Sequence, residues 1–120
     1  MNVKVYFFKE PEIEMIIKNN RISSQALFTL YDLVWESEFK NILNPGRIWL
    51  KFKEEDKPFG IPLRDKKSHN KIYLGDIIQI ADDYYIVDTV GVRKIIIIKN
   101  WFINLVMKSC KYAFYYVKAH

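Results

Sequence analysis

The chain has 120 residues, of which half are hydrophobic and 16% are aromatic, and it carries a formal net charge of +5. This composition excludes a disordered chain, and we expect residues 1–120 to fold as a single domain with a substantial core. The positive charge favours an anionic partner, which is either an acidic protein surface or a nucleic acid. A lysine-rich surface on an ordinary soluble protein is the alternative explanation of the same charge.

The cellular compartment is suggested by the cysteine content and the hydrophobic segments. The one cysteine, Cys110, allows no disulfide within the chain and favours a reducing environment. The longest apolar region runs from Ile95 to Met107 and is shorter than the roughly 20 residues that span a bilayer. The apolar stretch near the N-terminus is too short for a signal peptide. We therefore expect a cytoplasmic protein that does not bind membranes.

The first elements along the chain are short. Val3 to Phe8 predicts a strand that ends before Pro11. The isoleucines within residues 12–19 have helical spacing, which predicts a short amphipathic helix. Residues 26–39 predict a strand with a bulge, because the apolar positions change phase before Leu33. A helix remains an alternative for this segment.

A second helix is predicted after Asn44. Asn is a favoured N-cap residue, and Pro45 suits the first helical position because proline lacks the N–H that would be unpaired there. Ile48, Trp49 and Phe52 then form one apolar face. The residues that follow, 56–70, contain two prolines and a glycine and predict a loop.

Residues 72–98 predict a β-meander of three strands. Gly75 and Asp76 form a turn before the first strand, short polar residues at 81–83 form the next turn, and Gly91 marks the last one. The strands themselves consist of β-branched and aromatic residues. This meander is the part of the chain on which the other elements are expected to pack.

The end of the chain is less defined by its pattern. Ile95 to Ile98 has the composition of a strand that is buried on both faces. Residues 101–117 permit either a final helix or a strand. The whole pattern predicts a single small α+β domain with a mostly antiparallel sheet of about five strands and two or three short helices on one face.

Three short motifs follow one another between residues 28 and 95. They are Tyr31-Asp32-Leu33-Val34-Trp35 with Glu38 and then Ile48-Trp49 with Phe52, Gly75-Asp76-Ile77-Ile78, and Tyr84-Tyr85-Ile86-Val87-Asp88-Thr89 with Gly91 and Ile95. Together they resemble the YodL-like family of small proteins from phages, plasmids and other mobile elements. The resemblance implies a mobile-element origin and an α+β fold, but no activity. In this chain residues 70–74 replace the Ser-Leu-Ser run that usually precedes the Gly-Asp pair, and the tail after Ile95 has no counterpart.

Positive charge is concentrated in residues 64–71, which we call the cationic loop. Its basic residues are Arg64, Lys66, Lys67, His69 and Lys71. We expect these side chains to lie outside the core and to form a binding surface for an acidic partner. A protein of this kind would act by binding a host or defence factor, as an accessory protein of a mobile element, rather than by catalysis.

The same loop also permits an enzymatic alternative. In a toxin-type endoribonuclease, His69 would move a proton near neutral pH, while Arg64 and Lys67 would hold a phosphate. Residues 58–70 are similar to the "IPL…K…H" segment of type III toxin–antitoxin endoribonucleases. The other histidine, His120, stands at the end of the chain, so the second proton carrier would be a lysine, a tyrosine or a carboxylate.

A nucleic-acid-binding module is a further alternative. Exposed aromatic rings beside cations can stack on bases. Candidates with this arrangement are Tyr73, Tyr84 and Tyr85, and, in the tail, Lys111, Tyr112, Tyr115, Tyr116 and Lys118. The competing interpretation is that rings at this density fill a small core.

No metal and no cofactor are expected. The carboxylates that could suggest a metal site are Asp76, Asp82, Asp83 and Asp88, and they stand at turns where short acids bond to the backbone. The sequence contains no calcium-loop spacing, no Cys/His cluster and no phosphate-binding glycine loop. A homodimer formed through an edge strand at Ile95 to Ile98 is one more arrangement that the sequence permits.

Overall fold

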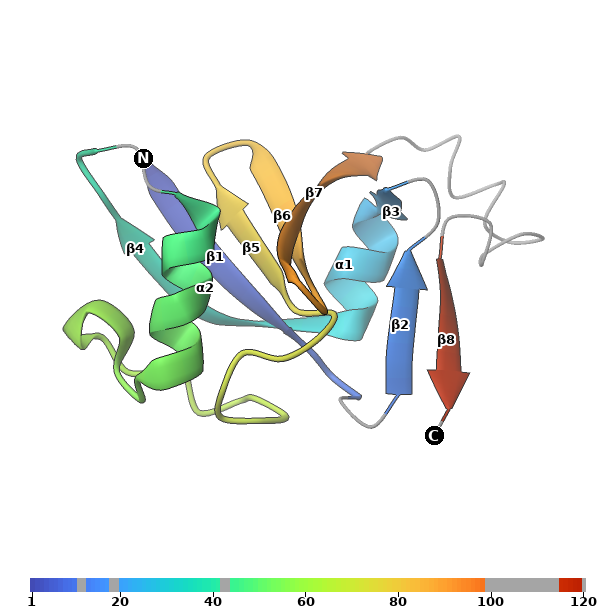
Figure 1. Ribbon diagram of the computed structural model, residues 1–120, viewed down its shortest axis with the longest axis horizontal. Coiled ribbons are helices and arrows are strands. Elements are labelled where there is room, and N and C mark those ends of the chain that lie inside the picture. Colours follow the sequence, from blue (N-terminus) through green and yellow to red (C-terminus); the bar gives the residue numbers. More distant parts are fainter. Residues whose placement is uncertain (11–12, 18–19, 42–43, 99–114, 120) are drawn as a thin grey trace.

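The computed structural model describes residues 1–10, 13–17, 20–41, 44–98 and 115–119. Its elements in chain order are β1 (Asn2–Phe8), β2 (Ile13–Ile17), β3 (Arg21–Ser23), α1 (Ser24–Leu30), β4 (Tyr31–Glu38), α2 (Pro45–Glu54), the 3-10 turn η1 (Pro58–Gly60), β5 (Ile77–Ile80), β6 (Asp83–Asp88), β7 (Gly91–Ile98) and β8 (Tyr115–Ala119). Within these ranges a six-stranded sheet has the order β3-β7-β6-β5-β1-β4, and β2 pairs with β8 in a separate sheet (Figure 1).

The predicted meander is confirmed as β5, β6 and β7. β6 pairs antiparallel with both β5 and β7, and β1 pairs antiparallel with both β4 and β5. The pair between β3 and β7 is parallel. The turn between β5 and β6 places Ala81 at a φ of 54°, and β7 begins with Gly91 at a φ of 130°. A residue with a side chain rarely adopts the second of these angles, which accounts for the glycine. The fold is therefore α+β with a mostly antiparallel sheet, as expected.

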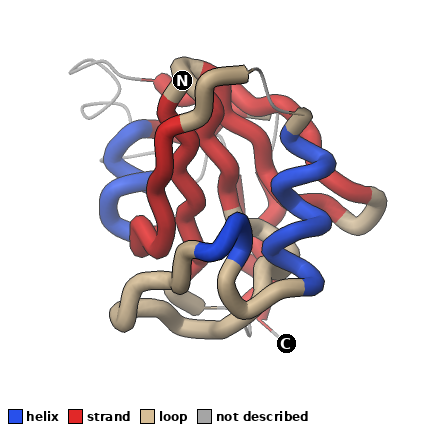
Figure 2. The backbone as a smooth tube through the Cα atoms, turned by 90° about the vertical axis from the view of Figure 1, so that its left-hand side faces the viewer, coloured by secondary structure: helices blue, strands red, loops and turns tan. Residues whose placement is uncertain are grey.

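The sheet has an apolar core on each face. Successive side chains of a strand point to opposite faces. Accordingly Phe7 and Ile78 belong to one buried cluster, and their neighbours Phe8 and Ile77 belong to the other. Figure 2 shows helices on both sides of the strands. The expectation that the helices share one face is wrong, because strands with apolar residues at successive positions need cover on both faces.

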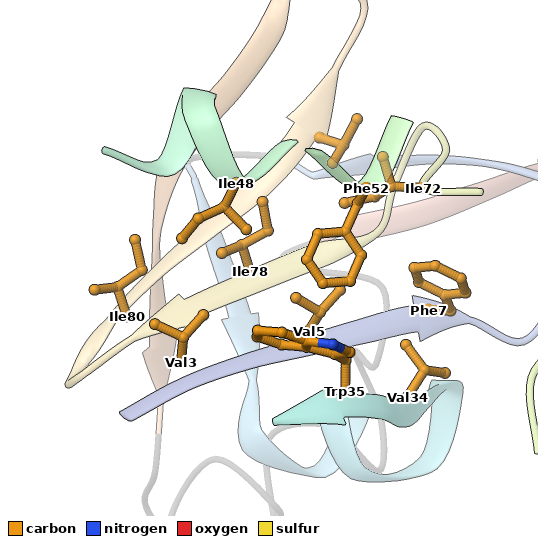
Figure 3. Close-up of a cluster of buried hydrophobic side chains, with 11 residues drawn as sticks. Val3, Val5, Phe7, Val34, Trp35, Ile48, Phe52, Ile72, Ile78 and Ile80 are labelled. Carbon is orange, nitrogen blue, oxygen red and sulfur yellow. The ribbon is translucent and has the colours of Figure 1, made fainter. Parts of the chain in front are cut away.

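α2 covers one of these faces, and it begins where the sequence predicts. The Asn44 side chain is the N-cap and accepts a hydrogen bond from the Gly46 N–H at 2.8 Å. Ile48 and Phe52 are buried and point from the helix toward Trp35 and its neighbours on the sheet (Figure 3). The cap and the apolar spacing are both local features, so the sequence is sufficient to predict this helix.

α1 covers the other face and replaces the first part of the strand predicted at 26–39. Ser23 is its N-cap, and the Ser23 hydroxyl accepts a hydrogen bond from the Ala26 N–H at 3.0 Å. Ala26, Leu27 and Leu30 pack against the core of that face. The helix ends at Leu30 and β4 follows at once, so the strand prediction is wrong for residues 26–30 and right from residue 31 onward.

β4 contains a bulge, but not where the change of phase before Leu33 placed it, because at that point α1 ends and β4 begins. Val5 pairs with Trp35, but the next residue of β1, Tyr6, pairs with Leu33, so Val34 is the extra residue. Val34 and Trp35 are consecutive, yet both are buried in the same core. A bulge permits this because it interrupts the alternation of side chains.

The prediction of a helix within residues 12–19 is wrong. Residues 13–17 form β2, which pairs antiparallel with β8 from Ile13–Ala119 to Ile17–Tyr115. Isoleucine favours strands, and pairing with a segment distant along the chain overrides the helical spacing. In the region where helix and strand were both open, residues 115–119 are a strand; residues 101–114, including Cys110, lie outside the described part of the chain.

The expectation that Ile95 to Ile98 is buried on both faces is also wrong. Ile95 is buried, but 58% of the Ile96 surface is exposed. Val92, near the start of β7, packs against the core under α2, whereas Ile96 lies beyond that core. The edge of β7 at Ile96 to Ile98 already pairs with β3 within the chain. None of the helices in the described ranges has both the length and the apolar character to cross a membrane.

Candidate functional site

The cationic loop crosses the sheet at the end of β1 and is fastened there at several points. Before it, the Trp35 indole N–H donates to the Ile61 carbonyl at 3.1 Å. At its start, the Arg64 N–H donates to the Val34 carbonyl at 2.8 Å. Near its end, the Ser68 hydroxyl donates to the carbonyl of Phe8, the last residue of β1, at 2.7 Å. These bonds join a segment without regular structure to two strands.

A tight turn at residues 73–76 connects the loop to β5. The Asp76 N–H donates to the Tyr73 carbonyl at 3.0 Å, and the Asp76 carboxylate accepts from the Tyr73 N–H at 2.7 Å. Gly75, the third residue of the turn, has a φ of 91°, an angle that favours glycine. The Tyr31 hydroxyl donates to the Gly75 carbonyl at 2.6 Å and holds the turn against β4.

Asp76 is the most deeply buried charged residue of this region, with no exposed surface. One carboxylate oxygen, Oδ1, accepts from the Phe8 N–H at 2.7 Å; the other, Oδ2, lies 2.7 Å from Nε2 of His69. Burial raises the pKa of the Asp76 carboxyl above its ordinary value, against the opposing effects of the His69 bond and of the two backbone N–H groups. A protonated carboxyl is thus favoured here more than at the surface.

Phe8 explains why side chains gather at this point. The last pair between β1 and β5 is Tyr6–Ile77, so Phe8 extends beyond the end of β5. Both of its main-chain polar groups are bonded by side chains instead, the N–H by Asp76 and the carbonyl by Ser68. Buried main-chain groups require partners, and these two side chains provide them where the strand ladder stops.

His69 lies between Ser68 and Asp76. Its ring stacks on the buried Phe7 ring with centroids 4.3 Å apart and planes inclined by 9°. Its Nδ1 lies 2.7 Å from the Ser68 oxygen and its Nε2 2.7 Å from Asp76, so both ring nitrogens have partners within the chain. The order Ser-His-Asp is that of a hydrolase triad, but the Ser68 hydroxyl proton is directed to the Phe8 carbonyl rather than to the imidazole. The arrangement therefore serves as an anchor for the loop.

Of the five basic residues expected to lie outside the core, Arg64 and Lys66 are exposed, whereas Lys67, His69 and Lys71 are partly buried. The Lys66 side chain is 84% exposed and that of Arg64 is 53% exposed. Each has a carboxylate on β4 at ion-pair distance: Arg64 is 3.5 Å from Glu36, and Lys66 is 3.8 Å from Asp32. Lys67 donates to the Arg64 carbonyl at 3.3 Å.

Lys71 lies apart from these three and bonds Asp56 at 2.8 Å, which lowers the pKa of the exposed Asp56 carboxyl. Of the five residues predicted to form one surface, the structure keeps Arg64, Lys66 and Lys67 together. His69, whose side chain is only 15% exposed, belongs to the anchor beneath this surface.

The predicted aromatic platforms differ in their exposure among the described residues. Of the three tyrosines proposed beside cations, Tyr73 is exposed, Tyr85 is partly buried and Tyr84 is buried. The candidates at residues 111 and 112 lie outside the described residues, as do the side chains of residues 115–118.

Sequence reasoning missed Asp76 and Ser68 as parts of one site. It placed Asp76 in a turn where it bonds the backbone, which is what the bond from Tyr73 shows, but it did not predict the burial or the bond to His69. The sequence did contain a signal for the burial of Asp76. This acid stands directly before Ile77 and Ile78, and a residue at the start of a buried strand is buried with it.

The chain matches no protein-family model, and no curated protein or solved structure matches it either. In the described ranges no three His, Cys, Asp or Glu side chains are grouped so that they could hold a metal ion. The resemblance to the YodL-like family stays a prediction that rests on the quoted motifs alone.

Proposed function

We propose that this protein acts by binding an acidic protein partner through Arg64, Lys66 and Lys67, rather than by catalysis. The observation that carries the proposal is the combination of exposed cations with an anchored backbone. A partner that meets a loop already held in place does not have to order it, and this lowers the entropic cost of binding. The net charge of +5 would favour the approach of such a partner over long distances.

The ion pairs with β4 are compatible with this function. The Arg64–Glu36 pair at 3.5 Å lies at the surface and contributes about 0–1 kcal/mol, and the Lys66–Asp32 pair at 3.8 Å has an 84% exposed cation. Carboxylates of a partner can therefore replace Glu36 and Asp32 at little cost. Arg64 can also form a two-pronged bond with a carboxylate, which a lysine cannot.

The proposed partner is a host or defence factor, which an accessory protein of a mobile element would bind. The endoribonuclease alternative receives less support from the site, because both ring nitrogens of His69 are engaged and the ring is mostly covered. If His69 were a catalytic acid–base, expression of the protein would arrest growth and His69→Ala would restore it. Growth that is unaffected by the wild-type protein would remove this alternative.

The binding surface can be tested by neutralising it. We expect the triple variant Arg64→Gln, Lys66→Gln, Lys67→Gln to lose capture of the dominant protein that the wild type retains from host extract, by at least tenfold. The matched control is Arg47→Gln, Lys53→Gln, Lys94→Gln, which removes the same charge from exposed side chains elsewhere. The control should capture the partner as the wild type does.

Two outcomes would contradict the proposal. Equal loss in the control would mean that net charge alone drives binding. Binding of a single-stranded oligonucleotide in place of a protein, with an affinity that falls steeply as salt rises, would favour the nucleic-acid alternative.

A further inference from the structure

The bonds that anchor the cationic loop require a definite number of protons. A carbonyl only accepts hydrogen bonds, so the bond between Ser68 and Phe8 uses the single hydroxyl proton of Ser68. The Ser68 oxygen is then an acceptor toward His69, and Nδ1 of His69, 2.7 Å away, must carry a proton to complete that bond. The position of this proton follows from the geometry of the three groups.

The other side of the imidazole needs a proton as well. Nε2 of His69 and Oδ2 of Asp76 lie 2.7 Å apart, and a proton must lie between them for a hydrogen bond. It can belong to the imidazole, which is then a cation beside a carboxylate, or to the carboxyl, which then faces a neutral imidazole. In both cases the His69–Asp76 pair has no net charge and all the bonds from Phe8 to Asp76 are complete.

Removal of one proton breaks this series of bonds. If the remaining imidazole proton stays on Nδ1, two acceptors face each other between His69 and Asp76. If it moves to Nε2, then Nδ1 becomes an acceptor, the Ser68 hydroxyl turns toward it, and the Phe8 carbonyl loses its partner. A buried polar group without a partner is unfavourable, so the deprotonated pair holds the loop less strongly.

The surroundings of the pair favour retention of the proton. Asp76 has no exposed surface, and burial raises the pKa of its carboxyl. His69 is the charged group that acts on it, while the Phe8 and Tyr73 amides donate from β1 and from the turn. On β4 the neighbouring groups are the Tyr31 hydroxyl, bonded to the turn, and Asp32, which lies 3.9 Å from Lys9 and 3.8 Å from Lys66.

We propose that the loss of one proton from the His69–Asp76 pair releases the cationic loop from β1, so that pH regulates the surface assigned to binding. The release rests on the geometry of Ser68, His69 and Asp76. Only its consequence for a partner rests on the proposed function.

Nuclear magnetic resonance can follow both events in the intact chain. The Phe8 and Tyr73 amides donate to the Asp76 carboxylate, so their proton shifts report its charge. Backbone order parameters of residues 65–70 report the anchoring of the loop. Between about pH 4 and pH 9, we expect a one-proton step in the shifts together with a fall in order parameters from about 0.85 to below about 0.6.

Two variants keep the inference falsifiable. His69→Gln retains an N–H donor for Asp76 but cannot titrate, so its order parameters should not depend on pH. Ser68→Ala removes the bond to the Phe8 carbonyl without touching Asp76, so its loop should be mobile at every pH. A wild-type loop that remains rigid throughout the range, a pH-dependent fall in order parameters that persists in His69→Gln, or a rigid loop in Ser68→Ala would each overturn the inference.

The same samples separate this inference from the proposed function. If the loop is released in the wild type but neutralisation of Arg64, Lys66 and Lys67 leaves capture of the partner unchanged, the proposed function fails and the release stands. If neutralisation abolishes capture while the loop stays rigid at every pH, the proposed function stands and the release is overturned.

Discussion

At the scale of single residues, the Asp76 side chain supplies a hydrogen-bond acceptor to β1 where the pairing with β5 has ended. Its carboxylate accepts from the Phe8 and Tyr73 N–H groups and contacts His69, and it is fully buried. A buried acid is tolerated when hydrogen bonds satisfy its oxygens, and here two backbone donors and an imidazole do so. The residue therefore supports the backbone of β1 and the position of the cationic loop at once.

Replacement of Asp76 should be costly because it leaves buried donors behind. In Asp76→Ala the Phe8 N–H loses its acceptor, and the free energy of unfolding should fall by about 1–3 kcal/mol for this group alone. Asp76→Asn should lose less, because an amide oxygen can still accept from Phe8. The measurement is urea unfolding with an unchanged m-value. Asp65→Ala, an exposed acid of the same loop, is the control, and a loss as large as that of Asp76→Ala would contradict this account.

At the scale of elements, the helices and strands differ in how far local sequence or tertiary contacts determine their secondary structure. α2 has an N-cap, a proline at its first position and a buried apolar face, and all three can be read from consecutive residues. α1 has a cap at Ser23, but its apolar residues also fit a strand, so its state depends on packing. β2 depends on β8, which lies about a hundred residues further along the chain.

The cap of α2 makes a prediction of its own. Asn44→Ala removes the side-chain acceptor of the Gly46 N–H and should lower the free energy of unfolding by about 1 kcal/mol. Asn44→Asp keeps an acceptor and adds a negative charge at the helix N-terminus, so it should be close to the wild type or slightly more stable. Chemical denaturation of the three proteins decides this. An equal fall in the free energy of unfolding in Asn44→Ala and Asn44→Asp would contradict this prediction, because it would mean that the Asn44 side chain stabilises the protein in some way other than by accepting from Gly46.

At the scale of the whole molecule, a central sheet separates two cores. α1 covers one face and α2 the other, and strand residues alternate between the clusters (Figures 1 and 2). Side chains on β1 and β5 consequently lose part of their contact with water even where they carry polar groups. The Tyr6 hydroxyl, which donates to Gln79 at 2.7 Å, is one of these.

Tyr6 links this burial to the stability of the molecule at high pH. Burial, followed by the charges of Tyr84 and Glu36, raises the pKa of Tyr6 from 10.0 to about 12. Between these values the unfolded chain has lost the proton while the folded chain keeps it. The free energy of unfolding should therefore fall as pH rises from 10 to about 12.

Tyr6→Phe isolates this contribution because phenylalanine does not titrate. The variant should be less stable than the wild type near neutral pH by about 1 kcal/mol, the value of a hydrogen bond. The difference between the two proteins should shrink above pH 10 and not below it. Urea unfolding across the alkaline range measures this difference, and a constant difference would refute the assignment.

The sequence alone determined the parts of the fold that depend on neighbouring residues. The meander follows from β-branched runs between glycines and short polar residues, and α2 follows from Asn44 and its apolar spacing. The exposure of Arg64 and Lys66 also follows from local charge, because several cations in a short loop cannot be buried together.

Only the tertiary structure decided where distant groups meet. Ile13–Ile17 is a strand because β8 pairs with it, and α1 is a helix because its leucines face a core built by other strands. The anchor under the cationic loop depends on Phe8 extending beyond β5, which brings a main-chain N–H and carbonyl to Asp76 and Ser68. Hydrogen bonds between residues about sixty positions apart have no signature in local sequence, and that is the physical reason why the charged loop was predictable and its proton-dependent anchor was not.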